Sequence, residues 1–204
     1  MEMPDKEKMR IFTIGHSNHS LETFLNLLRG LRIDVVVDIR SNPNSRVVPH
    51  FNRKSIESSL KEGGFKYLYF GEELGGKPES KEFYDSNGYV LYSQIAKTTL
   101  FNNGISRLLK GIRGYRVALL CSEEDPTNCH RRLLVGKVLR EQGVSIEHIR
   151  GDGRVQSEGE LANTEGPQNR DETQLTLFDK KETQEWKSTQ SVLPGRKLKN
   201  SSES

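Results

Sequence analysis

Apolar residues follow two alternating patterns along most of the chain. Short runs rich in β-branched residues predict buried strands, and apolar residues at helical spacing predict helices between them. The predicted strands cover residues 11–14, 33–39, 65–70, 117–121 and 145–149. The predicted helices cover residues 21–28, 52–60, 89–101, 105–112 and a segment that ends near Gln142. This order is typical of an α/β domain with a mostly parallel sheet and helices on both faces.

The pattern stops near Gly151. From there Gly, Ser, Glu, Asn and Gln become frequent and the apolar periodicity disappears. A segment of this composition has too little apolar surface to offset the entropy cost of folding. We therefore expect an α/β domain over residues 1–150 and a disordered C-terminal tail over residues 151–204.

Charge and cysteine content narrow the class of protein. Residues 1–150 hold 23 basic and 18 acidic residues, whereas residues 151–204 hold 8 and 10, so the positive excess belongs to the predicted domain. A mild excess permits nucleic acid or phosphorylated ligands without requiring them. Two cysteines, no apolar leader segment and no long apolar run favour a cytoplasmic protein without a membrane partner.

Polar segments of unusual composition follow four of the predicted strands. They are Gly15-His16-Ser17, Asp38-Ile39-Arg40, Gly71 to Gly76, and Cys121-Ser122-Glu123 with Cys129-His130-Arg131 after it. In a parallel α/β sheet the carboxyl ends of the strands share one edge, where ligands bind. Such loops are polar in any α/β fold, but filler loops would consist of Ser, Asn and Gly rather than histidine, cysteine and arginine. We expect the functional site at this edge.

Cys129 is the candidate nucleophile. With Asp125 as helix N-cap and Pro126 as the first helical residue, Cys129 and His130 would lie near the positive end of a helix. That end and the neighbouring Arg131 favour a thiolate, so we expect a lowered pKa at Cys129. The competing interpretation is a half-buried cysteine without reactivity.

The other candidate site residues fall into two sets. The predicted catalytic residues are Cys129, His130, His16 and Glu123. The predicted phosphate- and substrate-binding residues are Gly15, Ser17, Arg40, Arg46 and Arg131. For Arg40 and Arg131 the alternative is pairing with Asp38 or Glu123 that only holds the loops. Cys121, at the end of a buried strand, is expected in the core.

The same cysteine and histidine side chains could instead bind a metal ion. Cys121, Cys129, His130 and His16 carry atoms that bind zinc. Neighbouring residues on a helix point about 100° apart, so Cys129 and His130 are not expected to share one ion. The chain has no C-x-x-C pair, and its strand-end carboxylates show no pattern that defines a magnesium site. We therefore expect no metal and no other cofactor.

The strand-end segments resemble those of a known family, domain of unknown function family 488. The resemblance rests on Thr13 to Ser17, Asp38-Ile39-Arg40 with Pro43 and Ser45, Leu74-Gly75-Gly76, and Leu120 to Glu123 followed by Cys129-His130-Arg131. It spans about residues 11–150. The resemblance implies a compact α/β domain and supplies no activity.

A short apolar motif interrupts the predicted tail. It consists of Gln174, Leu175, Thr176, Leu177 and Phe178. It resembles the pentapeptide Gln-Leu-x-Leu-Phe by which bacterial DNA polymerases and repair proteins bind the replication sliding clamp. Leu177 and Phe178 would anchor such a peptide and Gln174 would supply a polar contact. The alternative is a chance match.

Together these features predict a DNA-maintenance or repair enzyme. It would act on nucleic acid or a nucleotide through the Cys/His/Arg pocket, and the tail would tether it to the sliding clamp. Two alternatives stay open. One is a non-catalytic adaptor that binds nucleic acid or a nucleotide at the same edge. The other is a small-molecule phosphoester hydrolase for which the tail match is accidental.

Overall fold

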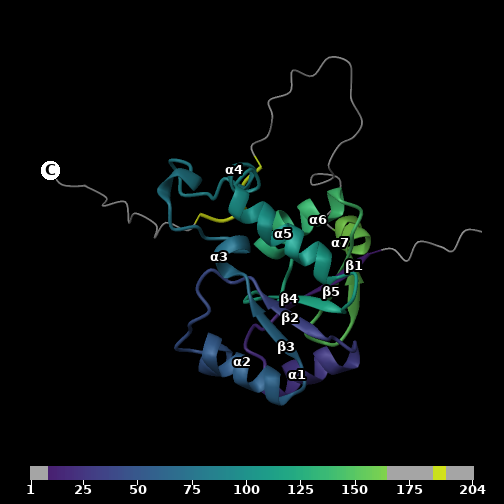
Figure 1. Ribbon diagram of the computed structural model, residues 1–204. Helices are drawn as coiled ribbons and strands as arrows, with labels where there is room; N and C mark the ends of the chain where they lie inside the picture. Colours follow the sequence, from purple (N-terminus) through teal and green to yellow (C-terminus); the bar gives the residue numbers. More distant parts are fainter. Residues whose placement is uncertain (1–8, 165–185, 192–204) are drawn as a thin grey trace, which may run out of the picture.

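The computed structural model describes residues 9–164 and 186–191, built around a six-stranded sheet in the order β3-β2-β4-β1-β5-β6 (Figure 1). The strands are β1 (Arg10–Gly15), β2 (Val35–Asp38), β3 (Lys66–Tyr69), β4 (Val117–Cys121), β5 (Ser145–Ile149) and β6 (Val155–Ser157). Neighbouring strands run parallel except β5 and β6, which are antiparallel. The predicted α/β class with a mostly parallel sheet is confirmed.

Helices cover both faces of the sheet (Figure 1). One face carries α1 (Leu21–Gly30) and α2 (Arg53–Glu62). The other carries α3 (Gly71–Leu74), α4 (Tyr92–Ile95), α5 (Thr99–Gly111), the π-helix η3 (Arg131–Gly136), α6 (Lys137–Glu141) and α7 (Glu158–Thr164). Two 3-10 helices, η1 (Pro49–Phe51) and η2 (Lys81–Phe83), lie in loops. No helix in the described part of the chain combines the length and apolar character needed to cross a bilayer.

The two faces bury separate apolar cores. Side chains alternate along a strand, so β1 sends Ile11 into one core and Phe12 and Ile14 into the other. The core beneath α1 and α2 includes Phe24, Leu28, Ile56 and Leu60. The opposite core includes Phe101, Ile105, Leu108, Leu134 and Leu139. Every residue of β2 and β4 is buried, as expected of central strands covered on both sides.

Helix boundaries follow local sequence signals in part. The Ser20 hydroxyl accepts a hydrogen bond from the Thr23 amide at 3.1 Å and so caps α1. Past the end of α2, Gly64 has a φ of 87°, a left-handed conformation that favours glycine. Asn52 occupies the N-cap position of α2, but its side chain accepts a hydrogen bond from the Ser45 amide at 2.6 Å and not from an amide of the helix. Asn52 therefore holds the loop between β2 and α2.

The folded unit continues past residue 150, where the sequence pattern predicts its end. Glu158 at the start of α7 accepts hydrogen bonds from Arg132 and from the ring of His148. Residues 186–191 return to the same unit, and the Trp186 indole donates to the Leu133 carbonyl at 2.8 Å. The predicted tail is thus wrong for residues 151–164 and 186–191, because polar contacts and single apolar side chains such as Leu161 and Trp186 hold them, without a periodic apolar face.

The motif at residues 174–178 lies outside the described residues. It stands in the chain between two stretches, 151–164 and 186–191, that both belong to the folded unit. The motif therefore lies between two anchored points of the chain and not in a terminal extension.

Candidate functional site

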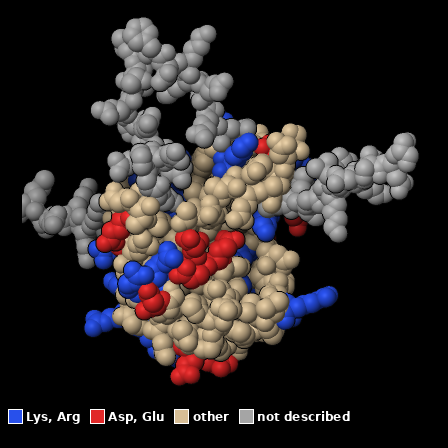
Figure 2. Space-filling view, turned by 180° about the vertical axis from the view of Figure 1, so that it is seen from behind, with Lys and Arg blue, Asp and Glu red and all other residues tan. Residues whose placement is uncertain are grey.

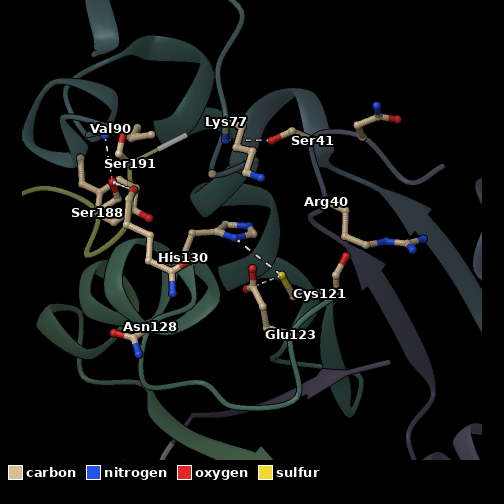
Figure 3. A pocket seen from close by; sticks show the side chains of 15 residues that line it. Arg40, Ser41, Lys77, Val90, Cys121, Glu123, Asn128, His130, Ser188 and Ser191 are labelled. Atoms are coloured by element: carbon tan, nitrogen blue, oxygen red, sulfur yellow. Dashed lines mark hydrogen bonds between the residues drawn. The ribbon is translucent and has the colours of Figure 1, made fainter. Parts of the chain in front are cut away.

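A cavity of about 380 Å³ opens at the edge of the sheet where β2 and β4 end (Figure 3). This is the edge at which the sequence places the candidate residues. Polar side chains dominate its lining, among them Ser41, Asn42, Lys77, Asn128, Ser188 and Gln190. Its volume lies within the range of about 300–1,000 Å³ that is usual for small-molecule sites.

Four side chains meet at one end of this cavity, and we call Cys121, Glu123, Cys129 and His130 the thiol cluster. The Cys121 sulfur lies 3.2 Å from the Cys129 sulfur and 3.7 Å from a carboxylate oxygen of Glu123. Nδ1 of His130 lies 3.7 Å from the Cys121 sulfur and 3.9 Å from the Cys129 sulfur. Both cysteines are free and buried, whereas Glu123 is exposed. Cys121, Glu123 and His130 face the cavity, and Cys129 lies behind them.

The end of β4 directs Cys121 into the cluster. Val117 and Leu119 of the same strand belong to the core beneath α5 and η3, and alternation places Cys121 on that face too. Because β4 ends at Cys121, this side chain leaves the apolar core and borders the cavity. Cys121 is thus buried, as expected of a core residue, and in addition it borders the cavity.

The loop after β4 brings the other members to the same point. The Asp125 carboxylate accepts hydrogen bonds from the amide and hydroxyl of Thr127 and closes a turn. The Cys129 amide then donates to the Pro126 carbonyl in a second turn, before η3 begins. The predicted helix start at Pro126 is wrong. On a turn, unlike a regular helix, the side chains of Cys129 and His130 converge.

The two thiols differ in acidity. The hydrogen bond from Cys129 lowers the pKa of Cys121 well below its ordinary value, and the nearby His130 and Arg131 lower it further against the effect of burial. Burial raises the pKa of Cys129 well above its ordinary value, and the neighbouring Cys121 adds to this rise. The predicted lowering of the pKa at Cys129 is therefore wrong. Cys121 is the more acidic sulfur and the one that borders the cavity.

His130 is held by its far ring nitrogen. Nε2 donates to the Ile39 carbonyl at 3.0 Å, which leaves Nδ1 directed at the two sulfurs. Burial alone would lower the pKa of His130, but the neighbouring Cys121 raises it above the ordinary value. Gly76 packs against the ring, and a Cβ there would stand 2.4 Å from Cγ of His130. A glycine is therefore needed at position 76 to leave room for the His130 imidazole.

Arg40 borders the cavity, but its charge is paired. Its guanidinium donates to both carboxylate oxygens of the buried Asp38, at 2.9 Å from Nε and 2.6 Å from Nη2. The Tyr67 hydroxyl donates to the same carboxylate. Figure 3 shows the Arg40 side chain directed away from the thiol cluster. The ion pair with Asp38, the alternative considered for Arg40, is the arrangement observed.

Arg131 and Gly15 build the loop and do not reach the cavity. The fully buried Arg131 donates to the carbonyls of Glu123 and Glu124. Gly15 lies directly beneath this loop, and a Cβ on it would stand 1.6 Å from the Glu123 carbonyl oxygen. Neither residue lines this cavity, and their phosphate contacts stay a prediction that this cavity does not support.

His16 lies on the opposite face of the sheet from the thiols. Its ring stacks on Phe51 with centroids 4.3 Å apart, and its Nδ1 donates to the Ser17 carbonyl. Burial lowers the pKa of His16 to about 4, so the ring is neutral near pH 7. Ser17 adopts a φ of 45°, and its amide donates to the Ser122 carbonyl. His16 therefore does not line the cavity beside the cysteines, and its catalytic role stays a prediction. The Ser17 contact joins the loops after β1 and β4.

The remaining predicted residues lie elsewhere. Arg46 is exposed in the loop after β2 and does not line the cavity. The four motif residues Gln174, Leu175, Leu177 and Phe178 lie outside the described ranges. Conversely, the sequence did not single out Lys77, Tyr92, Ser188 and Gln190, which do line the cavity. The last two belong to a polar stretch with no distinguishing composition, so only contacts in the fold, such as those of Trp186 and Ser188, identify them.

The thiol cluster is also the place where the described residues could hold a metal ion. One ligand atom from each of its four members lies within 4.8 Å of the others. The geometric objection raised from helical spacing is wrong, since the turn after β4 replaces the helix there.

Comparison with known proteins gives one match. The sequence profile of a family described as "Domain of unknown function DUF488" matches residues 20–138. No curated protein and no solved structure matches the chain.

Proposed function

Because the chain belongs to the DUF488 family, a domain of unknown function, we propose its function from the site itself. The protein is an enzyme that acts on a nucleotide, free or within a nucleic-acid strand, bound in the cavity beside the thiol cluster. The observation that carries this proposal is the meeting of two thiols, an imidazole and a carboxylate at the carboxyl end of β4, open to a cavity. Such groups are costly to gather inside a protein without a task.

The cavity lining fits a nucleobase. Ser41, Asn128 and Gln190 supply hydroxyl and amide groups for the edge of a base, and Val90 and Tyr92 supply apolar contact for its faces. Recognition of unpaired bases uses this combination of edge hydrogen bonds and contact with the ring. The cavity therefore suits one nucleoside unit.

The charged side chains at the site favour a ligand with one or two phosphates over a long DNA duplex. Lys77 lines the cavity and is exposed, whereas the Arg40 guanidinium is paired with Asp38. On the face in Figure 2, acidic and basic side chains lie next to one another, without a continuous basic tract among the described residues there. Broad binding of duplex DNA depends on neutralising many phosphates at once. A nucleotide or a short single strand suits this surface better.

Isothermal titration calorimetry with nucleoside monophosphates and short single-stranded oligonucleotides tests the proposal. Lys77→Ala should weaken binding about threefold to tenfold by removing a charged phosphate contact. Lys110→Ala, an exposed lysine near the end of α5, is the matched control and should bind as wild type does. Absence of binding by every ligand in the panel would overturn the proposal. Binding without any turnover would favour the non-catalytic adaptor.

The tether to the sliding clamp is a separate part of the proposal and rests on the sequence of residues 174–178. A peptide from Asp171 to Asp179 should bind a bacterial sliding clamp in fluorescence anisotropy. Replacing Leu177 and Phe178 with alanine should abolish binding, because large apolar anchors carry most of the energy of such contacts. Equal binding by both peptides would refute the tether while leaving the cavity proposal untouched.

A further inference from the structure

We infer that Cys121, Cys129 and His130 bind one zinc ion, with an open coordination position toward the cavity and the Glu123 carboxylate beside it. Zinc in catalytic sites takes three protein ligands and leaves one position for water or substrate. The three proposed ligands are buried or half-buried, whereas Glu123 is exposed on a loop. The carboxylate therefore serves better as the neighbour of the open position than as a fixed ligand.

The distances in the cluster fit a single small cation. Zinc–sulfur bonds of about 2.3 Å and zinc–nitrogen bonds of about 2.0 Å place tetrahedral donors roughly 3.5–3.8 Å apart. Nδ1 of His130 lies 3.7 Å and 3.9 Å from the two sulfurs. The sulfurs themselves are 3.2 Å apart and need to separate by about half an ångström to reach the spacing of bound thiolates. No rearrangement of the backbone is required.

An independent observation comes from the far side of the His130 ring. Its Nε2 donates to the Ile39 carbonyl, so in the neutral ring the lone pair belongs to Nδ1, which faces the sulfurs. Metal-binding histidines are almost always fixed in this way, with the second ring nitrogen bonded to a carbonyl or carboxylate. Gly76 packs against the ring and holds its orientation. The imidazole is thus preset as a ligand before any ion binds.

The choice of metal follows from the donor atoms. Two sulfurs and one nitrogen are soft or borderline ligands, which select zinc over magnesium or calcium. A bound cation also gives a reason for placing two thiols and a carboxylate within 4.8 Å of one another, where they would otherwise repel once deprotonated. Arg131 supports the same arrangement by fixing the carbonyls of Glu123 and Glu124.

This site also deepens the proposed function, on which the following step rests. A zinc ion held by two cysteines and a histidine, with a free glutamate beside it, is the set that nucleobase deaminases use to activate water. Here water would add to the ring carbon that carries the exocyclic amino group. Glu123 would take one proton from that water and pass it to the adjacent ring nitrogen, and it would then carry the proton of the added hydroxyl to the amino group. The carbon–nitrogen bond would break, ammonia would leave, and a carbonyl would remain in its place.

Phosphoryl transfer fits the site less well than this hydrolysis. It relies on several cations arranged around the transferred group, usually with magnesium. Of the described cationic side chains that line the cavity, Arg40 is committed to Asp38 and Lys77 stands at the exposed side. The zinc site would therefore act on the base and not on the phosphate.

Metal binding is tested first and without any substrate. The full chain, purified under reducing conditions and stripped with a chelator, should bind one zinc ion per chain in a competition titration with a chromophoric chelator. Cobalt in place of zinc should give a thiolate-to-metal charge-transfer band and the intense visible absorption of tetrahedral cobalt. Absence of both signals, with two titratable thiols present, would overturn the inference.

Variants locate the ion. His130→Asn and Cys129→Ser should weaken zinc binding at least about tenfold, while His50→Asn, an imidazole removed elsewhere, should leave it unchanged. Circular dichroism checks that each variant is folded. If Cys129→Ser does not fold, Cys121→Ser at the cavity side supplies the same test. Wild-type affinity in folded His130→Asn would overturn the assignment.

The reaction class has its own readout. Ammonia release from a panel of nucleosides, nucleotides and short oligonucleotides should require zinc and fall at least about a hundredfold in Glu123→Gln. The same variant should still bind zinc, and Glu79→Gln, at an exposed loop position, should keep full activity. Zinc binding without ammonia release would refute deamination and leave the metal site standing. Failure of nucleotides to bind in calorimetry would instead refute the proposed function.

Discussion

Replacing Gly15 with alanine should destabilise the protein and loosen the loop that carries Glu123. The added Cβ would stand 1.6 Å from the Glu123 carbonyl oxygen and 2.5 Å from Nη1 of Arg131. Neither neighbour is a flexible chain end, because the first is backbone and the second belongs to a fully buried side chain. Relief therefore requires the loop to move away from the end of β1.

The cost follows from the hydrogen bonds that cross this contact. The His16 amide donates to the Cys121 carbonyl at 3.0 Å, the Ser17 amide donates to the Ser122 carbonyl at 2.8 Å, and Arg131 donates to the Glu123 carbonyl. At a net value of about 1 kcal/mol each, their loss lowers the free energy of unfolding by about 3 kcal/mol. This figure agrees with the range of about 1–3 kcal/mol for overpacked cores.

Urea unfolding followed by far-ultraviolet circular dichroism measures this change. The matched control is Gly30→Ala, since nothing lies within 4 Å of a Cβ built at Gly30. Alanine is preferred to glycine in helices by up to about 1 kcal/mol, so this variant should be unchanged or slightly more stable. If Gly15→Ala stays within about 0.5 kcal/mol of the wild type, the close approach of loop and strand is not required and the reasoning fails.

Three further outcomes are expected. Asp38→Asn should lower the free energy of unfolding by about 3–5 kcal/mol in urea, because it leaves the buried Arg40 guanidinium without its charged partner; a loss below about 1 kcal/mol would contradict this. Trp186→Ala should release its segment and weaken nucleotide binding in calorimetry, while the fold persists in circular dichroism; unchanged binding would remove that segment from the ligand site. Burial lowers the pKa of His148, and the hydrogen bond from His148 lowers the pKa of Glu158 although burial opposes it. Both groups resist protonation when folded, so the free energy of unfolding should decline below about pH 6.5 through the histidine and further below about 4.5 through the glutamate. A flat profile in urea unfolding across pH 7 to 4 would refute it.

The sequence predicts the sheet well because its signal is local. The β-branched run around Val36 and the apolar run that ends at Cys121 each predict a central strand, and the structure buries both. By contrast, β6 and α7 lack such a signal, since Glu158 anchors them through contacts with distant residues. Polar contacts of this kind depend on partners far along the chain and leave no period in the sequence.

The sequence predicts at which edge of the sheet the site lies, but it predicts the role of each site residue less well. The assignment of Cys129 as the acidic thiol assumed a helix from Pro126, and the turn after β4 removes that premise. The position of His16 could have been predicted from the sequence. It follows Phe12 and Ile14 in alternation and so belongs to the opposite face of the sheet from Cys121. The pairing of Arg40 with Asp38 was considered, but only the structure decides between it and a ligand contact.

Residues 186–191 make the cavity dependent on the continuity of the chain. The segment is held by non-covalent contacts alone, among them Trp186 with the Leu133 carbonyl, Ser188 with the Val90 amide, and Lys187 with the Asp85 carboxylate. The covalent connection through residues 165–185 keeps such a short segment at a high effective concentration next to the site. A single proteolytic cut in that connection would leave every contact chemically intact, yet it would make closure of the cavity a bimolecular event. At low protein concentration the segment would then dissociate and open the cavity, while the rest of the fold would stay intact.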